Sequence, residues 1–162
     1  MKLPKNFQFG FQQKWVLITG GGKGTDRQIT AMLYGFNARV VALSRTKSDL
    51  QNLKEEINCE TIIAELSEPD AIRQVTEQTG EIDSLVNNAA IAILEPFLKI
   101  TVEAWDKTMA VNLRSVMIIS QVIAKQMIER GITDSIVNVS SMAAFQALHD
   151  HAAYCTRRVS IS

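Results

Sequence analysis

Short apolar runs alternate along this chain with segments in which apolar residues recur at helical spacing. Runs rich in β-branched residues occur at residues 15–19, 39–43, 61–66, 82–86 and 135–139, and each predicts a strand. Helical patterns occupy residues 27–34, 48–57, 69–78 and 101–130. Because strands and helices alternate throughout, we expect an α/β fold in which a doubly wound parallel sheet carries helices on both faces.

Residues with known preferences for helix ends mark several of these segments. Gly35 and Gly131 directly follow two helical patterns and predict where those helices end. Ser48 and Gln51 form a capping-box pattern at the start of the second helix, and Thr101 is a predicted N-cap. The helix that begins after Thr101 is therefore expected to be the longest element of the fold.

Length and composition are those of one globular domain. The chain has 162 residues, 46% of them apolar, and no linker or repeat divides it, so we expect a single domain over residues 1–162. The 17 basic residues balance the 17 acidic ones, which gives no reason to expect nucleic acid or an anionic membrane as a partner. Cys59 and Cys155 are too few and too far apart for a disulfide framework. With no signal peptide or membrane span recognisable, a cytoplasmic protein acting on a small molecule is the expectation.

A glycine-rich turn follows the first predicted strand. Residues 19–26 read Thr-Gly-Gly-Gly-Lys-Gly-Thr-Asp, directly before a helical pattern. Glycines let the backbone approach a ligand closely, and the amides at a helix start attract phosphate. Lys23 is followed by glycine rather than by Ser or Thr, so the turn is not a P-loop and ATP hydrolysis is not expected. We predict a dinucleotide phosphate site that includes Thr19, Gly20, Lys23 and Gly24.

The end of the second predicted strand carries a cation. Folds of this type that prefer NAD place an acid at this position, whereas a cation there accommodates a 2′-phosphate. Here the chain has Ser44, Arg45 and Thr46. The planar fork of Arg45 can grip a phosphate, and Lys23 adds a second charge, so NADP(H) is favoured over NAD(H). A solvated surface arginine is the alternative interpretation.

A hydroxyl pair stands near the end of the chain. Ser141 precedes Tyr154 by thirteen residues, and Arg158 lies one helical turn beyond the tyrosine. A carbonyl that receives hydride develops negative charge on oxygen, which a hydroxyl donor and a proton source can meet. A phenol does this near neutral pH only when a cation stabilises its phenolate, and Arg158 supplies that charge. The nearby His149 and His151 are interpreted as part of a polar loop, and no metal site is expected.

Together, these motifs resemble the short-chain dehydrogenase/reductase family. The resemblance rests on the turn at residues 19–24, on Asn87-Asn88-Ala89-Ala90, on Asn112, and on Ser141 with Tyr154, all in the family's order and spacing. It runs from about residue 9 to residue 158 and is greatest with the branch of L-xylulose and carbonyl reductases. The resemblance implies a Rossmann-like fold and NADPH-dependent reduction of small dicarbonyls or ketoses.

The resemblance also implies individual roles. Tyr154 would protonate the carbonyl oxygen, Ser141 would hydrogen-bond it, and Asn112 would hold a relay water. The segment Asn87, Asn88 and Ala89 would line the ribose side of the cofactor. Homo-oligomers are the rule in this family, but much of the interface lies in the part of the family fold that follows residue 162.

Several positions depart from the family pattern. Asp26 replaces a glycine where the helix begins beside the pyrophosphate, Arg158 replaces a lysine, and Glu65 replaces an aspartate that touches adenine. The chain ends eight residues after Tyr154, so we expect a fold without the family's last strands and with residues 135–139 as an unpaired edge. A catalytically impaired homologue or truncated isoform that binds a partner protein is the alternative to an active reductase.

Overall fold

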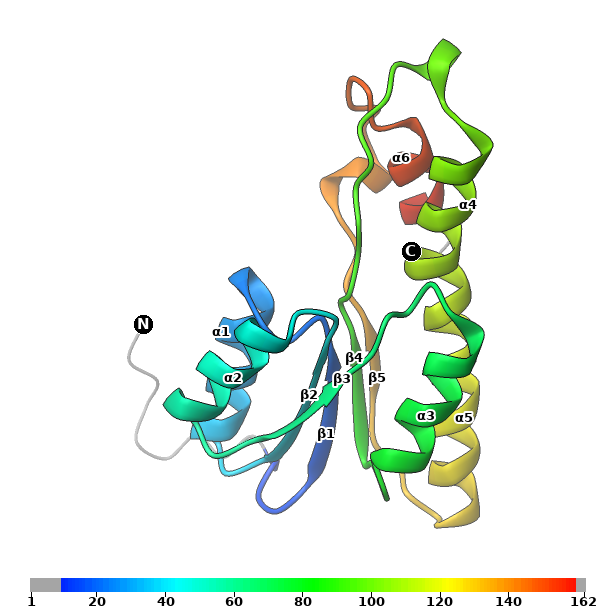
Figure 1. Ribbon diagram of the computed structural model, residues 1–162. Helices are drawn as coiled ribbons and strands as arrows, with labels where there is room; N and C mark the ends of the chain where they lie inside the picture. The colour runs from blue at the N-terminus through cyan, green and yellow to red at the C-terminus, as the bar shows by residue number, and fades with distance from the viewer. Residues whose placement is uncertain (1–9, 160–162) are drawn as a thin grey trace.

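A computed structural model describes residues 10–159, with the side chains of Thr76 and of residues 157–159 outside the description. Its centre is a five-stranded sheet with strand order β3-β2-β1-β4-β5 (Figure 1). The strands are β1 (Trp15–Thr19), β2 (Arg39–Ser44), β3 (Glu60–Ile63), β4 (Ser84–Asn87) and β5 (Ile136–Asn138). Every pairing in the sheet is parallel. The chain winds outward from β1 in both directions, which confirms the predicted doubly wound α/β fold.

Helices cover both faces of the sheet (Figure 1). Helices α1 (Gly24–Gly35) and α2 (Lys47–Glu56) lie on one face, and α3 (Pro69–Gln78) and α5 (Ser115–Glu129) lie on the other. Beyond the carboxyl ends of the strands lie α4 (Val102–Met109), α6 (Ala152–Val159) and the short 3₁₀ turns η1 (Phe97–Lys99) and η3 (Met142–Ala144). Within residues 10–159, no helix has the length and apolar character needed to cross a membrane.

Alternate residues of the central strand explain why both faces are covered. Leu17 is fully buried in the core shared with α3 and α5, where it joins Ile119. Its neighbour Ile18 points to the opposite face and packs in the core that contains Leu50 and Leu53 of α2. Because side chains along a strand alternate between faces, a strand that is apolar at every position needs a helical layer on each side. Burying each of these side chains contributes about 1.5–3 kcal/mol.

The helix and strand ends differ from the sequence prediction by one to three residues at several positions, of which three have a clear physical reason. Gly35 is the last residue inside α1, because the Phe36 amide still bonds to Met32, and the chain turns at Asn37, whose φ is 62°. Asparagine tolerates this left-handed conformation better than other non-glycine residues. The capping box at Ser48 is wrong, since α2 already begins at Lys47 after the N-cap Thr46. Strand β3 ends at residue 63 instead of 66, because its partner β2 ends opposite that position.

The long helical segment after residue 101 is interrupted. Thr101 caps it as predicted, since its hydroxyl accepts a hydrogen bond from the Ala104 amide, and Gly131, with φ of 66°, follows its last turn. Between α4 and α5, however, residues Ala110–Arg114 form a π-helical turn, η2. A π turn inserts one extra residue into the helix and changes which side chain faces inward, and such turns are frequent at functional sites. Here the turn contains the fully buried Asn112.

A carboxylate ties three strands together at the amino end of the sheet. Asp134, just before β5, accepts hydrogen bonds from the Lys14 ammonium group before β1 and from the hydroxyl of Ser84 in β4 (2.7 Å). The Ser135 amide donates a further bond of 2.9 Å. Burial acts to raise the pKa of Asp134, but these donors outweigh it and hold the pKa below the ordinary value of 3.8. The folded state therefore gains stability from the charged carboxylate, and loses that gain as the pH falls through the lowered pKa.

Replacing this carboxylate tests its role in the sheet. We expect Asp134→Asn to lower the free energy of unfolding by about 2 kcal/mol at pH 7, because one partner of a charged hydrogen-bond cluster is lost. The difference from the parent chain should shrink as the pH falls below 3.8 and through the lowered pKa, because the parent carboxylate is then protonated first in the unfolded state and finally in the folded state. Urea unfolding followed by circular dichroism at several pH values measures both effects. The matched control is Asp70→Asn, which removes a carboxylate from an exposed pair with Arg73 and should change stability by less than about 0.5 kcal/mol. Equal effects of the two substitutions would contradict the assignment.

Candidate active site

A pocket opens at the carboxyl ends of the strands. It has a volume of about 200 Å³ and draws its walls from the turns after β1, β2, β3 and β4 and from η2. The residues that line it are Gly20, Lys23, Asp26, Leu43, Ser44, Arg45, Thr46, Asp49, Ala64, Glu65, Leu66, Ala89, Ala90, Ile91 and Val111. The turns after the first, second and fourth strands thus converge, as expected at the carboxyl ends of neighbouring parallel strands. The sequence also predicts that the turn after Val139 joins them, but no residue of that turn is among the residues that line this pocket. The volume is below the roughly 300–1,000 Å³ of typical ligand sites, so the pocket would enclose only part of a large ligand.

The glycine turn packs closely against its neighbours. Gly20 has a φ of 85°, and a Cβ there would lie 3.0 Å from the Ala89 Cα and 2.7 Å from the Asp26 Oδ2. Only glycine fits at this position. The amides of Gly20 and Gly21 both donate to the Leu43 carbonyl of β2 (2.7 and 3.1 Å). The turn is therefore bonded to the end of β2.

The amides suited to a phosphate come from the start of α1. That helix begins at Gly24, whose φ is 65°, and its first helical hydrogen bond runs from Arg27 to the Lys23 carbonyl. The preceding first-turn amides point out of the helix end, where they favour an anion. Lys23 itself is a wall residue of the pocket. The sequence correctly located the turn, but in the fold Gly20 and Gly21 use their amides to bond to the sheet.

Asp26 brings a carboxylate to the predicted phosphate site. Its side chain lies over Gly20, and it is one of the pocket walls. Burial raises the pKa of Asp26 above 3.8, while a hydrogen bond from the Asn88 side chain and one from its own backbone amide act to lower it. The carboxylate in the first turn also complements the helix dipole. One side chain thus stabilises the helix start and places negative charge where a phosphate would lie.

Charges of both signs face each other across the pocket. Its walls contain the cations Lys23 and Arg45 and the carboxylates Asp26, Asp49 and Glu65. Ser44 and Thr46 flank Arg45, and the Thr46 amide donates to the Ser44 hydroxyl (3.4 Å). The acidic wall residues outnumber the basic ones, so the balanced charge of the whole chain does not describe this region.

Two predicted site residues hold strands together. Thr19 is buried, and its hydroxyl accepts hydrogen bonds from the backbone amides of Asn88 and Ala89, both at 3.1 Å. Asn87 is also buried, and its side-chain nitrogen donates to Ser120 and to Asn138 of β5, both at 2.9 Å. These side chains connect the ends of β1, β4 and β5, and so position the turn that carries Asn88 and Ala89.

Asn112 performs a similar task from the π-helical turn. Its side-chain oxygen accepts a hydrogen bond from the Ile91 amide (2.8 Å), and its nitrogen donates to the Ile91 carbonyl (2.7 Å). This two-point bond fixes the segment after β4 against the long helix. Because Ile91 is a wall of the pocket, Asn112 shapes the pocket through the backbone that it holds.

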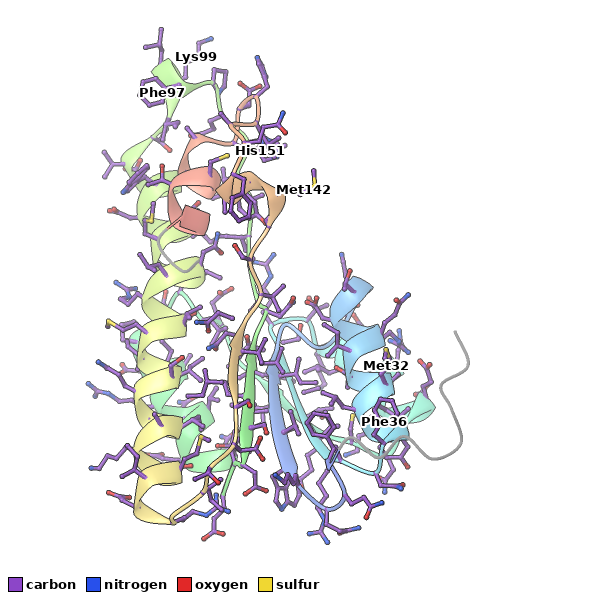
Figure 2. All side chains as sticks on the ribbon, turned by 180° about the vertical axis from the view of Figure 1, so that it is seen from behind. Met32, Phe36, Phe97, Lys99, Met142 and His151 are labelled. Atoms are coloured by element: carbon purple, nitrogen blue, oxygen red, sulfur yellow. The ribbon has the colours of Figure 1, made fainter. Side chains whose placement is uncertain are left out.

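The elements that carry the hydroxyl pair lie beyond the carboxyl ends of the strands, where Figure 2 labels Met142 of η3 and His151, the residue before α6. Ser141 is the N-cap of η3, and its hydroxyl oxygen accepts a hydrogen bond from the Ala143 amide (3.3 Å). Helix α6, which carries Tyr154, packs beside η3. The Tyr154 ring meets the His151 ring edge-on, with 6.2 Å between the ring centroids. The elements that carry the two hydroxyls are therefore neighbours. The Arg158 side chain lies outside the described residues.

Some residues of the site were not predicted as contacts. Ala90 and Ile91 follow the predicted Asn-Asn-Ala segment directly, so extending that segment would have found them. For Asp49, which also lines the pocket, the sequence holds only a weak sign of a site residue, namely an acid in the first turn of α2. In the polar loop before α6, His149 bonds to Asp150 (2.9 Å) and is almost fully exposed. Within residues 10–159, no three His, Cys, Asp or Glu side chains are grouped to hold a metal.

Comparison with known proteins agrees with this geometry. The sequence profile of the family described as short chain dehydrogenase matches residues 14–160. L-xylulose reductase of Mesocricetus auratus is 44% identical over 150 residues, which are 92% of this chain and 62% of that protein. D-erythrulose reductase of Gallus gallus is 44% identical and carbonyl reductase [NADPH] 2 of Sus scrofa is 42% identical, over 91% and 93% of this chain and 61% and 62% of those proteins. The chain thus spans about three fifths of the length of these relatives.

Solved structures share the same architecture. A putative NAD(P) dependent gluconate 5-dehydrogenase from Beutenbergia cavernae has a TM-score of 0.89 at 27% identity, over 96% of this chain and 65% of that one. A metagenomic short-chain oxidoreductase in complex with NADP has a TM-score of 0.84 at 29% identity, over 91% and 71% of the two chains. The profile match, the relatives and the fold together show that this chain belongs to the short-chain dehydrogenase family.

Proposed function

We propose that this chain binds NADP(H) and reduces small carbonyl compounds, such as dicarbonyls and ketoses like L-xylulose. The observation that carries the proposal is the placement of Arg45 and Lys23 in one pocket at the carboxyl ends of the strands. In the same chain η3, which Ser141 caps, packs against α6, which carries Tyr154. Relatives named L-xylulose reductase, D-erythrulose reductase and carbonyl reductase [NADPH] 2 support the substrate class.

The residues present fit a nicotinamide dinucleotide in most respects. Gly20 gives the close backbone approach, the first-turn amides of α1 and the Lys23 side chain suit a pyrophosphate, and Arg45 suits a 2′-phosphate. Ala89 lines the same pocket, and Asn88 contacts Asp26 beside it. Structures of family members with bound NADP support this choice of cofactor. Asp26 is the residue that opposes it.

The hydroxyl pair would act on the substrate carbonyl. When bound, the reduced cofactor supplies hydride to the carbonyl carbon. Tyr154 would give its proton to the carbonyl oxygen, which becomes negative as hydride arrives. The Ser141 hydroxyl uses one lone pair for the Ala143 amide, which leaves its hydrogen as a donor toward the same oxygen.

Asn112 would contribute through its backbone. Both polar atoms of its side chain are bonded to Ile91, so a relay water has to be held by other atoms of the π-helical turn. The backbone carbonyl of Asn112 is the acceptor that we propose.

We also propose that residues 1–162 form a single dinucleotide-binding domain. One continuous sheet with a core on each face supports this assignment. The cytoplasmic location stays a prediction.

A second candidate is a catalytically impaired chain that binds a partner protein. The half-buried Asp26 carboxylate over Gly20 favours it, because negative charge there repels a pyrophosphate. The edge strand β5, with Val137 48% exposed, offers a surface for pairing with another chain. Turnover is the measurement that separates the two candidates.

The first experiment measures NADPH binding by the nucleotide's own fluorescence, and then NADPH oxidation with L-xylulose or diacetyl. We expect saturable binding and turnover. Tyr154→Phe should lower the rate by roughly 10²-fold or more, because it removes the proton donor, and leave NADPH affinity within about two-fold. Tyr34→Phe in α1 is the matched control and should not change the rate. Binding without turnover would favour the second candidate, and a Tyr154→Phe variant as fast as the parent would contradict the role of Tyr154.

The second experiment removes the charge of Asp26. We expect Asp26→Asn, and likewise Asp26→Gly, to raise NADPH affinity roughly ten-fold at pH 7, since one unit charge beside a phosphate is lost. In the parent chain the affinity should rise as the pH falls toward the raised pKa of Asp26, because protonation removes the same charge. This rise should be smaller in Asp26→Asn. Isothermal titration calorimetry between pH 5 and pH 8 measures both quantities. An unchanged affinity in both variants would show that Asp26 does not oppose the nucleotide.

A further inference from the structure

Glu65 and Arg45 meet at the wall of the pocket, although their strands are separate in sequence. Arg45 directly follows β2, and Glu65 lies two residues after β3, which pairs with β2 up to Ser44 and Ile63. The Ala64 amide extends this pairing with a bond of 3.2 Å to the Ser44 carbonyl. The two side chains therefore leave the sheet side by side, and the Arg45 Nη1 lies 3.8 Å from the Glu65 Oε2.

A hydrogen bond to its second oxygen orients the Glu65 carboxylate. Its Oε1 accepts a hydrogen bond from the Ser67 amide (3.3 Å), two residues further along the chain. The Ser67 carbonyl in turn accepts a bond of 2.8 Å from the Arg114 guanidinium in η2. The turn after β3 is thus fixed on both sides of Ser67, and it holds one carboxylate oxygen toward Arg45.

Both members of the pair remain open to water and to a ligand. The Arg45 side chain is 56% exposed and the Glu65 side chain 39% exposed. An exposed ion pair of this kind is weak, so Arg45 can exchange its partner for a better one. A phosphate monoester offers up to two charges and oxygens that match the guanidinium fork, and is the stronger acceptor.

We infer that Glu65 is a specificity-determining residue, which competes with a ribose 2′-phosphate for Arg45 and so lowers the preference for the 2′-phosphorylated nucleotide. The inference rests on the proposed function, since it assumes a dinucleotide in this pocket. The carboxylate acts twice, by occupying Arg45 before the nucleotide binds and by repelling the phosphate afterwards. With three carboxylates against two cations in the pocket wall, removing this one acid changes the local balance substantially.

The experiment uses two small probes, 2′,5′-ADP and 5′-AMP, which differ in the 2′-phosphate and need no turnover. Their affinities for the full chain are measured by isothermal titration calorimetry. We expect Glu65→Gln, which keeps an acceptor for the Ser67 amide, to raise the affinity for 2′,5′-ADP about five-fold and to change that for 5′-AMP less than two-fold. In an Arg45→Gln background the same substitution should have less than half of this selective effect, because the competed group is gone.

Asp49→Asn is the matched control, since it removes another carboxylate from the same pocket and leaves the Arg45–Glu65 pair in place. A selective gain in Glu65→Gln that exceeds the gain in Asp49→Asn supports the inference. Equal changes for both probes, equal gains in the two variants, or no change at all would overturn it while leaving nucleotide binding established. If no variant bound either probe, the proposed function and the inference would both fall. Thermal unfolding of each variant, with a midpoint close to that of the parent, shows that the fold is retained.

Discussion

The site depends on the register with which β1 pairs in parallel with its two neighbours. Thr19 lies opposite Leu43 of β2 and opposite Asn87 of β4, which lies opposite Asn138 of β5. One row across four strands therefore marks the point where the sheet ends and the binding turns begin. A shift of one residue in any of these pairings would move the turns apart and reverse the faces of the strand's side chains. Close packing of the β1 side chains in a core on each face of the sheet opposes such a shift.

Polar side chains in this row form hydrogen bonds that hold the ends of the strands and the turns after them in place. The hydroxyl of Thr19 holds the chain after β4, Asn87 joins β4 to β5 and to α5, and Asn112 holds Ile91 from the π-helical turn. An unpaired polar group in these buried places costs stability, so most polar atoms of these side chains are bonded. The exception is the side-chain oxygen of Asn87, which is buried without a hydrogen-bond partner among the described residues. A residue that belongs to a functional motif can thus act by positioning the backbone that meets the ligand.

The electrostatics of the pocket oppose a highly charged ligand in part. Lys23 and Arg45 attract phosphate. The carboxylates of Asp26 and Glu65 are anions of the chain itself, and they compete with a phosphate for these cations and for the amides at the start of α1. Asp26 complements the start of α1, and Glu65 pairs with Arg45. Both carboxylates are therefore satisfied in the folded chain without a nucleotide. Binding has to replace these internal interactions, which makes affinity and selectivity sensitive to each of the two acids.

The sequence by itself determined the order of the elements, the parallel sheet and the position of the glycine turn. Apolar β-branched runs and helical periodicity depend on neighbours close in the chain, so they are readable without a fold. The exact strand ends, the turn at Asn37 in place of Gly35, and the π-helical turn around Asn112 were decided by pairing partners and by packing. The tertiary structure alone also decided that Gly20 and Gly21 bond to Leu43 and that Glu65 meets Arg45. Those contacts join residues from different strands, and their distances exist only once the sheet has formed.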